Sequence, residues 1–228
     1  MKRSTKKGDI GELKVIETLK QIKDEQYLIN NLILLGDNNI SHQMDHILIR
    51  HNGVFVIETK NYYGEISGQI DEPMWTRYIK IRGRNQPKKF INPLKQNNAH
   101  IRYLKKVLGK DIPFINFVVF VDNDISKLGI YTVVNLEQLN NRITLWECDT
   151  PLTSQKMKSI YDTLLHLEAD IQVEDHVNNI EKLKEDKRYK RQEYILVIEK
   201  GLCPICGHKV QMNKNIYTCP NCKYKLVV

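Results

Sequence analysis

The 228-residue sequence has no long apolar run, little glycine and proline, and only five cysteines. No stretch approaches the ~18 consecutive apolar residues of a membrane-spanning helix. The basic amino terminus, MKRSTKKGDIGELK, is not followed by the apolar segment of a secretory signal. With 11 glycines and 7 prolines, the chain is neither collagen-like nor of low complexity. We therefore expect a globular protein in the cytoplasm, without a membrane partner.

Acidic residues are absent from one long central stretch. From Arg77 to Lys110 the chain has eleven Lys or Arg and no Asp or Glu, whereas the net charge of the whole chain is +8. Such a run is usually a solvated face, but aromatic residues in or beside it are typical of a surface for nucleic-acid phosphates. We expect DNA as the partner, with RNA as an alternative because nothing in the sequence reads a 2′-hydroxyl. The aromatic residues are Trp75, Tyr78, Phe90 and Tyr103.

Hydrophobic periodicity predicts an α/β fold with a central mixed sheet flanked by helices. Two of the apolar runs, residues 54–60 and 114–121, read as strands that are buried on both faces. Helices are predicted over residues 9–23, 93–108 and 153–167, and strands over 27–35, 44–50, 54–60, 114–121 and 130–134, with further strands around Trp75 in residues 66–82.

Length and composition favour one full domain with a small appendage. A main domain is expected over residues 1–170, followed by a highly charged, helical connector over residues 171–200. The remaining residues, 201–228, contain four of the five cysteines and form the small appendage.

A carboxylate and an ammonium are predicted to lie side by side at the end of the strand VFVIETK. Glu58 and Lys60 are two residues apart, so they share one face of the strand. If Asn52-Gly53 forms a two-residue turn, Asp45 lies opposite Lys60 and diagonal to Glu58 on that face. The same alternation places His46 on the other face, which argues against a His-Asp-His metal site.

Charged groups at the end of an otherwise buried face are costly unless they pair or hold a metal ion. Two carboxylates and a backbone carbonyl, here that of Thr59, form a hard oxygen site suited to Mg²⁺ or Mn²⁺. Glu12, on the apolar side of the first helix, could add a ligand or hold a metal-bound water. The alternative is a purely structural ion pair of Lys60 with Asp45 or Glu58.

Several short motifs, in this order along the chain, resemble the nuclease-related domain (NERD) family. They are Gly11-Glu12, residues 43–47 (QMDHI), residues 56–61 (VIETKN) followed by Gly64, and Asn92-Pro93 followed by Gln96. The resemblance covers residues 8–122 and implies membership of the PD-(D/E)xK nuclease superfamily, with a restriction-endonuclease-like fold. Met44 stands where the superfamily name has a proline. The resemblance further implies Asp45 and Glu58 as Mg²⁺ ligands, Lys60 as the catalytic lysine, Glu12 as the acid of the first helix, and Gln96 as a helix residue near the site.

Four cysteines in two CPxC motifs predict a structural zinc site. Cys203 and Cys206 are separated by twelve residues from Cys219 and Cys222. Four thiolates around Zn²⁺ make a closed tetrahedral site without an open position for chemistry. The segment resembles the zinc ribbons at the carboxyl end of type I topoisomerases, which contact DNA. Lys223 stands where the first motif is followed by Gly207, a mild departure from the ribbon pattern.

Together these features lead us to expect Mg²⁺-dependent hydrolysis of DNA phosphodiester bonds, with the zinc ribbon as a second DNA contact. The alternative is a DNA-binding protein without catalytic activity, in which the same charged residues form a buried ion-pair cluster. RNA processing is a third possibility that shares the same electrostatic features.

Overall fold

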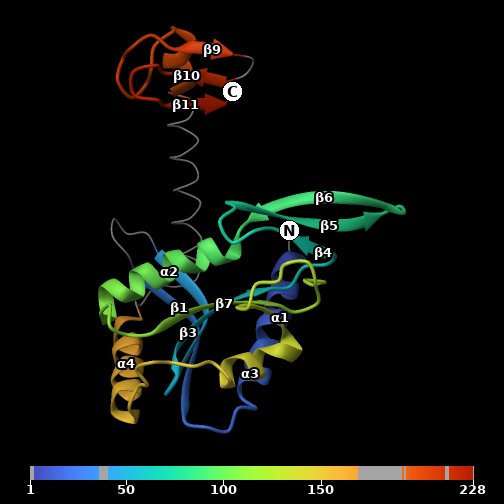
Figure 1. The fold of residues 1–228 in the computed structure, drawn as a ribbon, viewed down its shortest axis with the longest axis vertical. Coiled ribbons are helices and arrows are strands. Elements are labelled where there is room, and N and C mark those ends of the chain that lie inside the picture. Colours follow the sequence, from blue (N-terminus) through green and yellow to red (C-terminus); the bar gives the residue numbers. More distant parts are fainter. Residues whose placement is uncertain (1–2, 36–40, 169–191, 193, 214–215, 228) are drawn as a thin grey trace. The chain divides into compact units, whose positions relative to one another are not determined.

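The computed structural model describes residues 3–35, 41–168, 192, 194–213 and 216–227 (Figure 1). The chain divides into two compact units, residues 1–170 and 171–228. Most of the expected connector lies outside the described residues, and residues 194–199 are helical.

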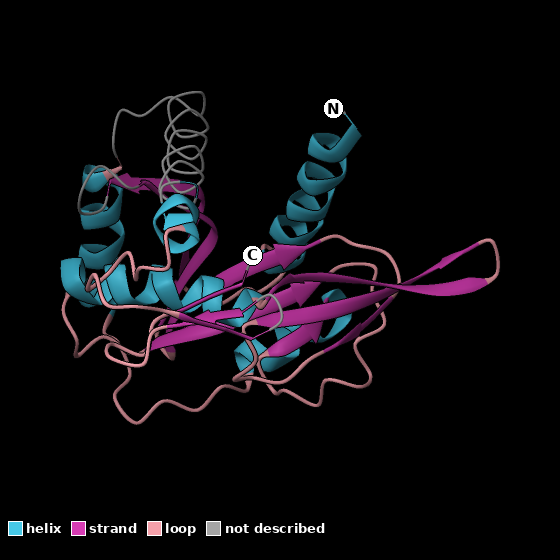
Figure 2. Cartoon of the chain, turned by 90° about the horizontal axis from the view of Figure 1, so that it is seen from above, coloured by secondary structure: helices cyan, strands magenta, loops and turns pink. Residues whose placement is uncertain are grey.

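A five-stranded mixed sheet forms the centre of the first unit, with helices on both faces, which confirms the predicted fold class (Figures 1 and 2). The first three strands pair antiparallel, and the last two run parallel to the third. In order across the sheet, the strands are β1 (Gln26–Leu35), β2 (Ser41–Arg50), β3 (Gly53–Lys60), β7 (Phe114–Phe120) and β8 (Val133–Asn135).

The two faces of the sheet are covered by different pairs of helices, because successive strand residues point to opposite faces. Helices α2 (Pro93–Leu108) and α4 (Ser154–Leu167) cover the face that carries Ile47 and Val56. Helices α1 (Arg3–Leu19) and α3 (Leu136–Thr144) cover the face that carries Leu48 and Phe55. The predicted cap of α2 is confirmed, since Asn92 accepts a hydrogen bond from the Leu94 N–H at 2.9 Å.

Two details of the helices differ from the sequence prediction. The helix α3 was not expected, because it is short and buries only Leu139 and Ile143, too few apolar positions for a helical period to stand out. In α1, a helical stripe through Leu13, Ile16 and Leu19 would face the core, yet Leu13 is 57% exposed. The buried side of α1 instead repeats every four residues, through Gly11, Val15 and Leu19.

A second sheet is inserted between β3 and α2. It contains β4 (Glu65–Ser67), β5 (Met74–Ile81) and β6 (Arg84–Ile91) in that order. The strand β6 was not predicted, because Pro87 interrupts it; the proline is tolerated because β6 is an edge strand. Trp75 is fully buried, stacks on Phe120 and donates from its indole N–H to the Gln69 carbonyl at 2.8 Å. Trp75 is therefore a core residue of this sheet and does not face a nucleic-acid partner.

The hairpin β2–β3 has a different turn from the predicted one. Arg50 pairs with Gly53, so the turn consists of His51 and Asn52. The Asn52 side chain is buried and donates to the carbonyls of Ile143 and Trp146 at 2.8 and 3.1 Å, which fixes it in the turn. The last pair of this register is His46 with Ile57, so the predicted pairing of Asp45 with Lys60 does not form. Met44 and Ile47, three residues apart, pack in the same core cluster, so the alternation of β2 is interrupted between them and does not fix the face of Asp45.

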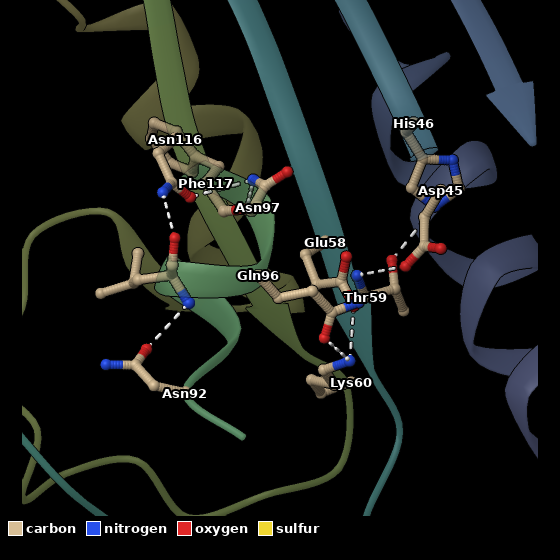
Figure 3. Close-up of polar contacts among 11 residues, drawn as sticks. Asp45, His46, Glu58, Thr59, Lys60, Asn92, Gln96, Asn97, Asn116 and Phe117 are labelled. Atoms are coloured by element: carbon tan, nitrogen blue, oxygen red, sulfur yellow. Dashed lines mark hydrogen bonds and ion pairs between the residues drawn. The ribbon is translucent and has the colours of Figure 1, made fainter. Parts of the chain in front are cut away.

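A buried asparagine joins α2 to the two central strands. The Asn97 side chain donates to the Val56 carbonyl on β3 at 2.6 Å. It also donates to the Phe117 carbonyl on β7 at 3.2 Å (Figure 3). It also donates to Asn116 Oδ1 at 2.9 Å. Asn97 therefore holds the amino-terminal half of α2 at a fixed height over the sheet.

We expect Asn97→Ala to lower the free energy of unfolding by about 2 to 3 kcal/mol, because it leaves buried acceptors without their donor. Urea unfolding followed by circular dichroism measures the change. The neighbouring exposed Asn98, whose side chain accepts one hydrogen bond from Asn116, is the matched control. If Asn98→Ala is as destabilising as Asn97→Ala, the bridging role is wrong.

Candidate active site and metal centre

The Asp45 side chain takes the place of a strand-to-strand contact where β2 and β3 separate. Pairing between these strands ends at His46 and Ile57. Beyond that point, the Thr59 N–H donates to Asp45 Oδ2 at 2.8 Å (Figure 3). In a strand, the N–H and C=O of one residue point to the same edge. The Thr59 carbonyl is therefore directed to the edge of β3 on which Asp45 lies.

Besides the contact between Asp45 and Thr59, the candidate site contains a group of three polar side chains: a carboxylate, an ammonium and an amide. Glu58 Oε1 lies 2.5 Å from Lys60 Nζ and accepts a hydrogen bond from Gln96 Nε2 at 2.8 Å (Figure 3). Gln96 Oε1 in turn lies 3.4 Å from Lys60 Nζ. The side chains of Glu58 and Lys60 are only 4% and 14% exposed. The sheet face under α2 thus brings together all three residues, as the sequence motifs had suggested.

Burial makes it costly for both carboxylates of this cluster to be ionised together. It raises the pKa of Asp45 to about 8, and repulsion from Glu58 adds to the rise, although the Thr59 N–H and Lys60 act in the opposite direction. Burial alone would lower the pKa of Lys60, but attraction by Glu58 outweighs it, and the pKa is raised above 10.5. A divalent cation beside the two carboxylates would relieve their repulsion.

Glu12 lies near this cluster without joining it directly. Gly11 approaches the chain just after β3, since a Cβ at Gly11 would lie 2.7 Å from the Cβ of Asn61. Burial raises the pKa of Glu12 despite a hydrogen bond with Asn31, and Glu58 contributes by repulsion. Among the described residues, however, only the four clustered cysteines bring three or more ligand atoms within 4.8 Å of one another. Glu12 therefore lies at the periphery of the site. It does not form a three-carboxylate ligand cluster with Asp45 and Glu58.

Behind Thr59 lies a polar network that sequence reasoning missed. His46 is fully buried; its Nδ1 lies 2.8 Å from Asn30 Oδ1, and its Nε2 lies 3.1 Å from Thr59 Oγ1. Burial lowers the pKa of His46 to about 4, so the imidazole is neutral. With Asn30 Oδ1 as acceptor, Nδ1 carries the proton and Nε2 accepts from the Thr59 hydroxyl. The network fixes Thr59, whose backbone holds Asp45. Its only sequence signal is the alternation that places His46 opposite Asp45.

The oxygen atoms at this point fit a hard divalent cation. Asp45 uses Oδ2 and Glu58 uses Oε1 in the contacts described above. Asp45 Oδ1, Glu58 Oε2 and the Thr59 carbonyl are oxygen atoms that could hold a cation. Two carboxylates and a carbonyl are suited to Mg²⁺ or Mn²⁺.

The four cysteines of the second unit form a compact cluster. Cys203 Sγ lies 3.6 Å from Cys222 Sγ, and Cys206 Sγ lies 3.5 Å from Cys219 Sγ. Sulfur atoms at ~2.3 Å from a tetrahedral Zn²⁺ are about 3.8 Å apart, so the spacing fits zinc. The cluster could therefore hold a zinc ion. Around it, the structure describes the strands β9 (Gln211–Asn213), β10 (Ile216–Thr218) and β11 (Lys225–Val227).

The two CPxC motifs have the same turn geometry. The Gly207 N–H donates to the Cys203 carbonyl at 2.9 Å, and the Lys223 N–H donates to the Cys219 carbonyl at 3.0 Å. Gly207 and Lys223 have φ values of 72° and 63°, so Lys223 adopts the left-handed conformation that its glycine counterpart adopts more easily. The difference between the motifs is thus one of side chain and not of backbone.

The fold and the site together define a class: an α/β domain with carboxylates, a lysine and a glutamine on its central sheet, followed by a four-cysteine unit. Within this class, the family model of the nuclease-related domain (NERD) matches residues 7–121, about half of the chain. The chain belongs to this family, which suggests a nuclease-related function with nucleic acid as substrate or partner.

An uncharacterized protein of Bacillus anthracis is 30% identical to this chain over 165 residues, which span 70% of this chain and 76% of that protein. No solved structure matches the chain. None of the described helices has the length and apolar character needed to cross a membrane.

The raised pKa of Asp45 predicts a stability effect with a definite sign. Between the ordinary value of 3.8 and about 8, the folded state keeps a proton that the unfolded state releases, so stability falls as pH rises through this window. Asp45→Asn removes this titration. At pH 8, without added Mg²⁺ or Mn²⁺, we expect the variant to be more stable than wild type by at least ~1.4 kcal/mol, the value of one pKa unit. The difference in free energy of unfolding between the variant and wild type should become smaller towards pH 4.

Urea unfolding at pH 5 and pH 8 measures this difference, with Asp111→Asn at an exposed position as the control. An equal effect of Asp45→Asn at both pH values would contradict the raised pKa.

The cysteine cluster predicts one zinc ion per chain. Cys206→Ser should reduce the bound zinc and loosen residues 194–227, because the metal supplies much of the folding free energy of such a small unit. Metal analysis of the purified protein and hydrogen exchange of this segment are the measurements. Cys148→Ser, the cysteine outside the cluster, should keep the zinc. Equal zinc content in all three proteins would refute the assignment.

Proposed function

We propose that the protein is a nuclease that depends on Mg²⁺ or Mn²⁺ and hydrolyses DNA phosphodiester bonds. One observation carries the proposal: the Thr59 N–H holds Asp45 on the edge of β3 to which the Thr59 carbonyl is also directed, next to the group of Glu58, Lys60 and Gln96. This is the order of residues that the PD-(D/E)xK pattern requires. Family membership supports the nuclease-related part of the proposal.

Each residue has a distinct role in this proposal. Asp45, Glu58 and the Thr59 carbonyl would hold the cation, which, when bound, polarises the phosphodiester and lowers the pKa of a coordinated water. Lys60 presents an ammonium group that orients the attacking water and offsets the negative charge of the transition state. Gln96 fixes both Glu58 and Lys60 through its amide. Glu12 supports the site from α1.

The four-cysteine unit adds a second contact to DNA in this proposal. Residues 201–228 contain four lysines and no acidic residue. A cysteine-bound zinc would leave the unit cationic outside the metal centre, and phosphate contacts of this kind depend strongly on salt.

A second candidate, a nucleic-acid-binding protein without catalytic activity, is favoured by the ion pair itself. Glu58 is buried, and its Oε1 is already paired with Lys60 and Gln96. In that case the cluster is structural, and removing Lys60 leaves a buried carboxylate without its partner, which is strongly destabilising.

Cleavage assays separate the two candidates. With Mg²⁺ or Mn²⁺, we expect wild type to cut supercoiled plasmid or single-stranded DNA, and Asp45→Ala and Lys60→Ala to reduce the rate by about 10² to 10³ while DNA binding persists. A gel-based cleavage assay and an electrophoretic shift assay measure the two properties. Lys127→Ala, which removes an exposed ion pair with Glu65, is the control and should cut normally.

No cleavage by wild type, together with loss of stability in both variants, would establish the structural candidate. Cleavage of RNA but not of DNA would contradict the proposed DNA substrate but would still support the proposed active site.

A further inference from the structure

The hairpin β5–β6 extends beyond the sheet to which it belongs. The two strands pair from Met74 with Ile91 to Ile81 with Arg84. The third strand, β4, reaches only to Tyr78. Beyond Tyr78 the hairpin is a ribbon of two strands, and Figures 1 and 2 show it as an arm that leaves the body of the first unit. Its turn, Arg82-Gly83, has φ values of 49° and 76°, as in a type I′ turn.

The charged residues of the hairpin are all basic. Lys80, Arg82 and Arg84 lie on the arm, Lys88 and Lys89 lie next to it on β6, and all five are exposed. Among the described residues, none of the five takes part in an ion pair. The surface therefore has basic groups along both strands and at its tip, ready for an anionic partner.

The charge arrangement opposes the stability of the hairpin. Arg77 lies directly opposite Lys88 across the two strands. Like charges in such a pair destabilise a hairpin. Arg82 adds a second cost, because a non-glycine residue adopts a left-handed conformation at the tip. An anionic ligand that lies against the arm would offset the first of these costs.

The dimensions of the arm decide which nucleic acid it fits. Three residues of each strand and the turn lie beyond β4, and at ~3.3 Å per residue the arm extends about 10 Å. The major groove of B-form DNA is about 8.5 Å deep and is wide enough for a two-stranded ribbon. The major groove of A-form RNA is too narrow. Single strands are held mainly by stacking on aromatic residues, and residues 79–86, the part of the hairpin beyond β4, contain none.

The arm is also connected to the candidate active site on both sides. It follows β3, which ends with Lys60, and it leads into α2, which begins with Pro93 and carries Gln96. A duplex held by the arm is thus attached to the two elements that supply the site.

We propose that the tip of the β5–β6 hairpin inserts into the major groove of duplex DNA and gives the protein its preference for a double-stranded substrate. This inference rests on the proposed function, since it names the form of DNA that reaches the site. Basic side chains on the two strands contact the phosphates on either side of the groove.

The test measures binding without cleavage, in the full chain carrying Asp45→Ala and without added Mg²⁺ or Mn²⁺. The tip variant is Arg82→Asn with Arg84→Gln, because asparagine before glycine suits a type I′ turn and keeps the hairpin folded. The control is Arg102→Ala with Lys105→Ala, which removes the same charge from the exposed side of α2. The probes are a labelled DNA duplex, one of its strands, and the same duplex with bulky 5-substituted pyrimidines that fill the major groove.

We expect the tip variant to lose about tenfold or more in duplex affinity, with a salt slope smaller by about two, while its affinity for the single strand changes little. The control should lower both affinities by similar factors, and the filled groove should weaken binding of the protein with an unaltered tip. Equal losses for duplex and single strand in the tip variant, or full affinity for the filled duplex, would overturn the inference. Because these are binding measurements, they are independent of whether wild type cleaves.

Discussion

The hydrogen bond from the Thr59 N–H to Asp45 is the contact on which the candidate site depends. It forms because β2 leaves β3 after His46, so that a backbone donor that would otherwise serve the sheet is free for a carboxylate. The strand β3 then separates its side chains by alternation. Glu58 and Lys60 face α2, whereas the Thr59 hydroxyl faces His46. One strand end thus positions an acid from its neighbour, presents its own acid and lysine, and is anchored from behind by a neutral imidazole.

The two candidate metal centres follow opposite physical rules. On the sheet, the hard oxygen atoms belong to the half-buried Asp45 and the buried Glu58, and the repulsion between them is only partly offset by Lys60. In the second unit, four soft sulfur atoms are already spaced for a tetrahedron, which leaves no position for a substrate. The first arrangement suits reversible binding and chemistry, and the second suits structural support. The two candidate centres lie in separate units that are each compact by themselves.

Local patterns predicted much of this arrangement, and long-range contacts explain what they missed. The face shared by Glu58 and Lys60 follows from a period of two, whereas the position of Asp45 depends on where the pairing of β2 with β3 ends and on the Thr59 N–H. The partnership of Asn30 with His46 depends on how β1 pairs with β2, which no local pattern specifies. The helix α3 was missed because it has too few apolar residues to show a helical period. The strand β6 was missed because an internal proline interrupts its pattern.

The parallel pairing of β3 with β7 has a consequence for how the site is assembled during folding. The hairpin β2–β3 is local in sequence, so Asp45 and Glu58 can come together early. In contrast, Val54 pairs with Phe114, and the chain must close a long loop that contains the whole second sheet and α2 before this contact forms. Such pairings are slow because the entropy of loop closure is lost before the contacts are gained. Gln96 is docked by its neighbour Asn97 only across this late pairing, so we expect the site to be completed in the last step of folding of the first unit.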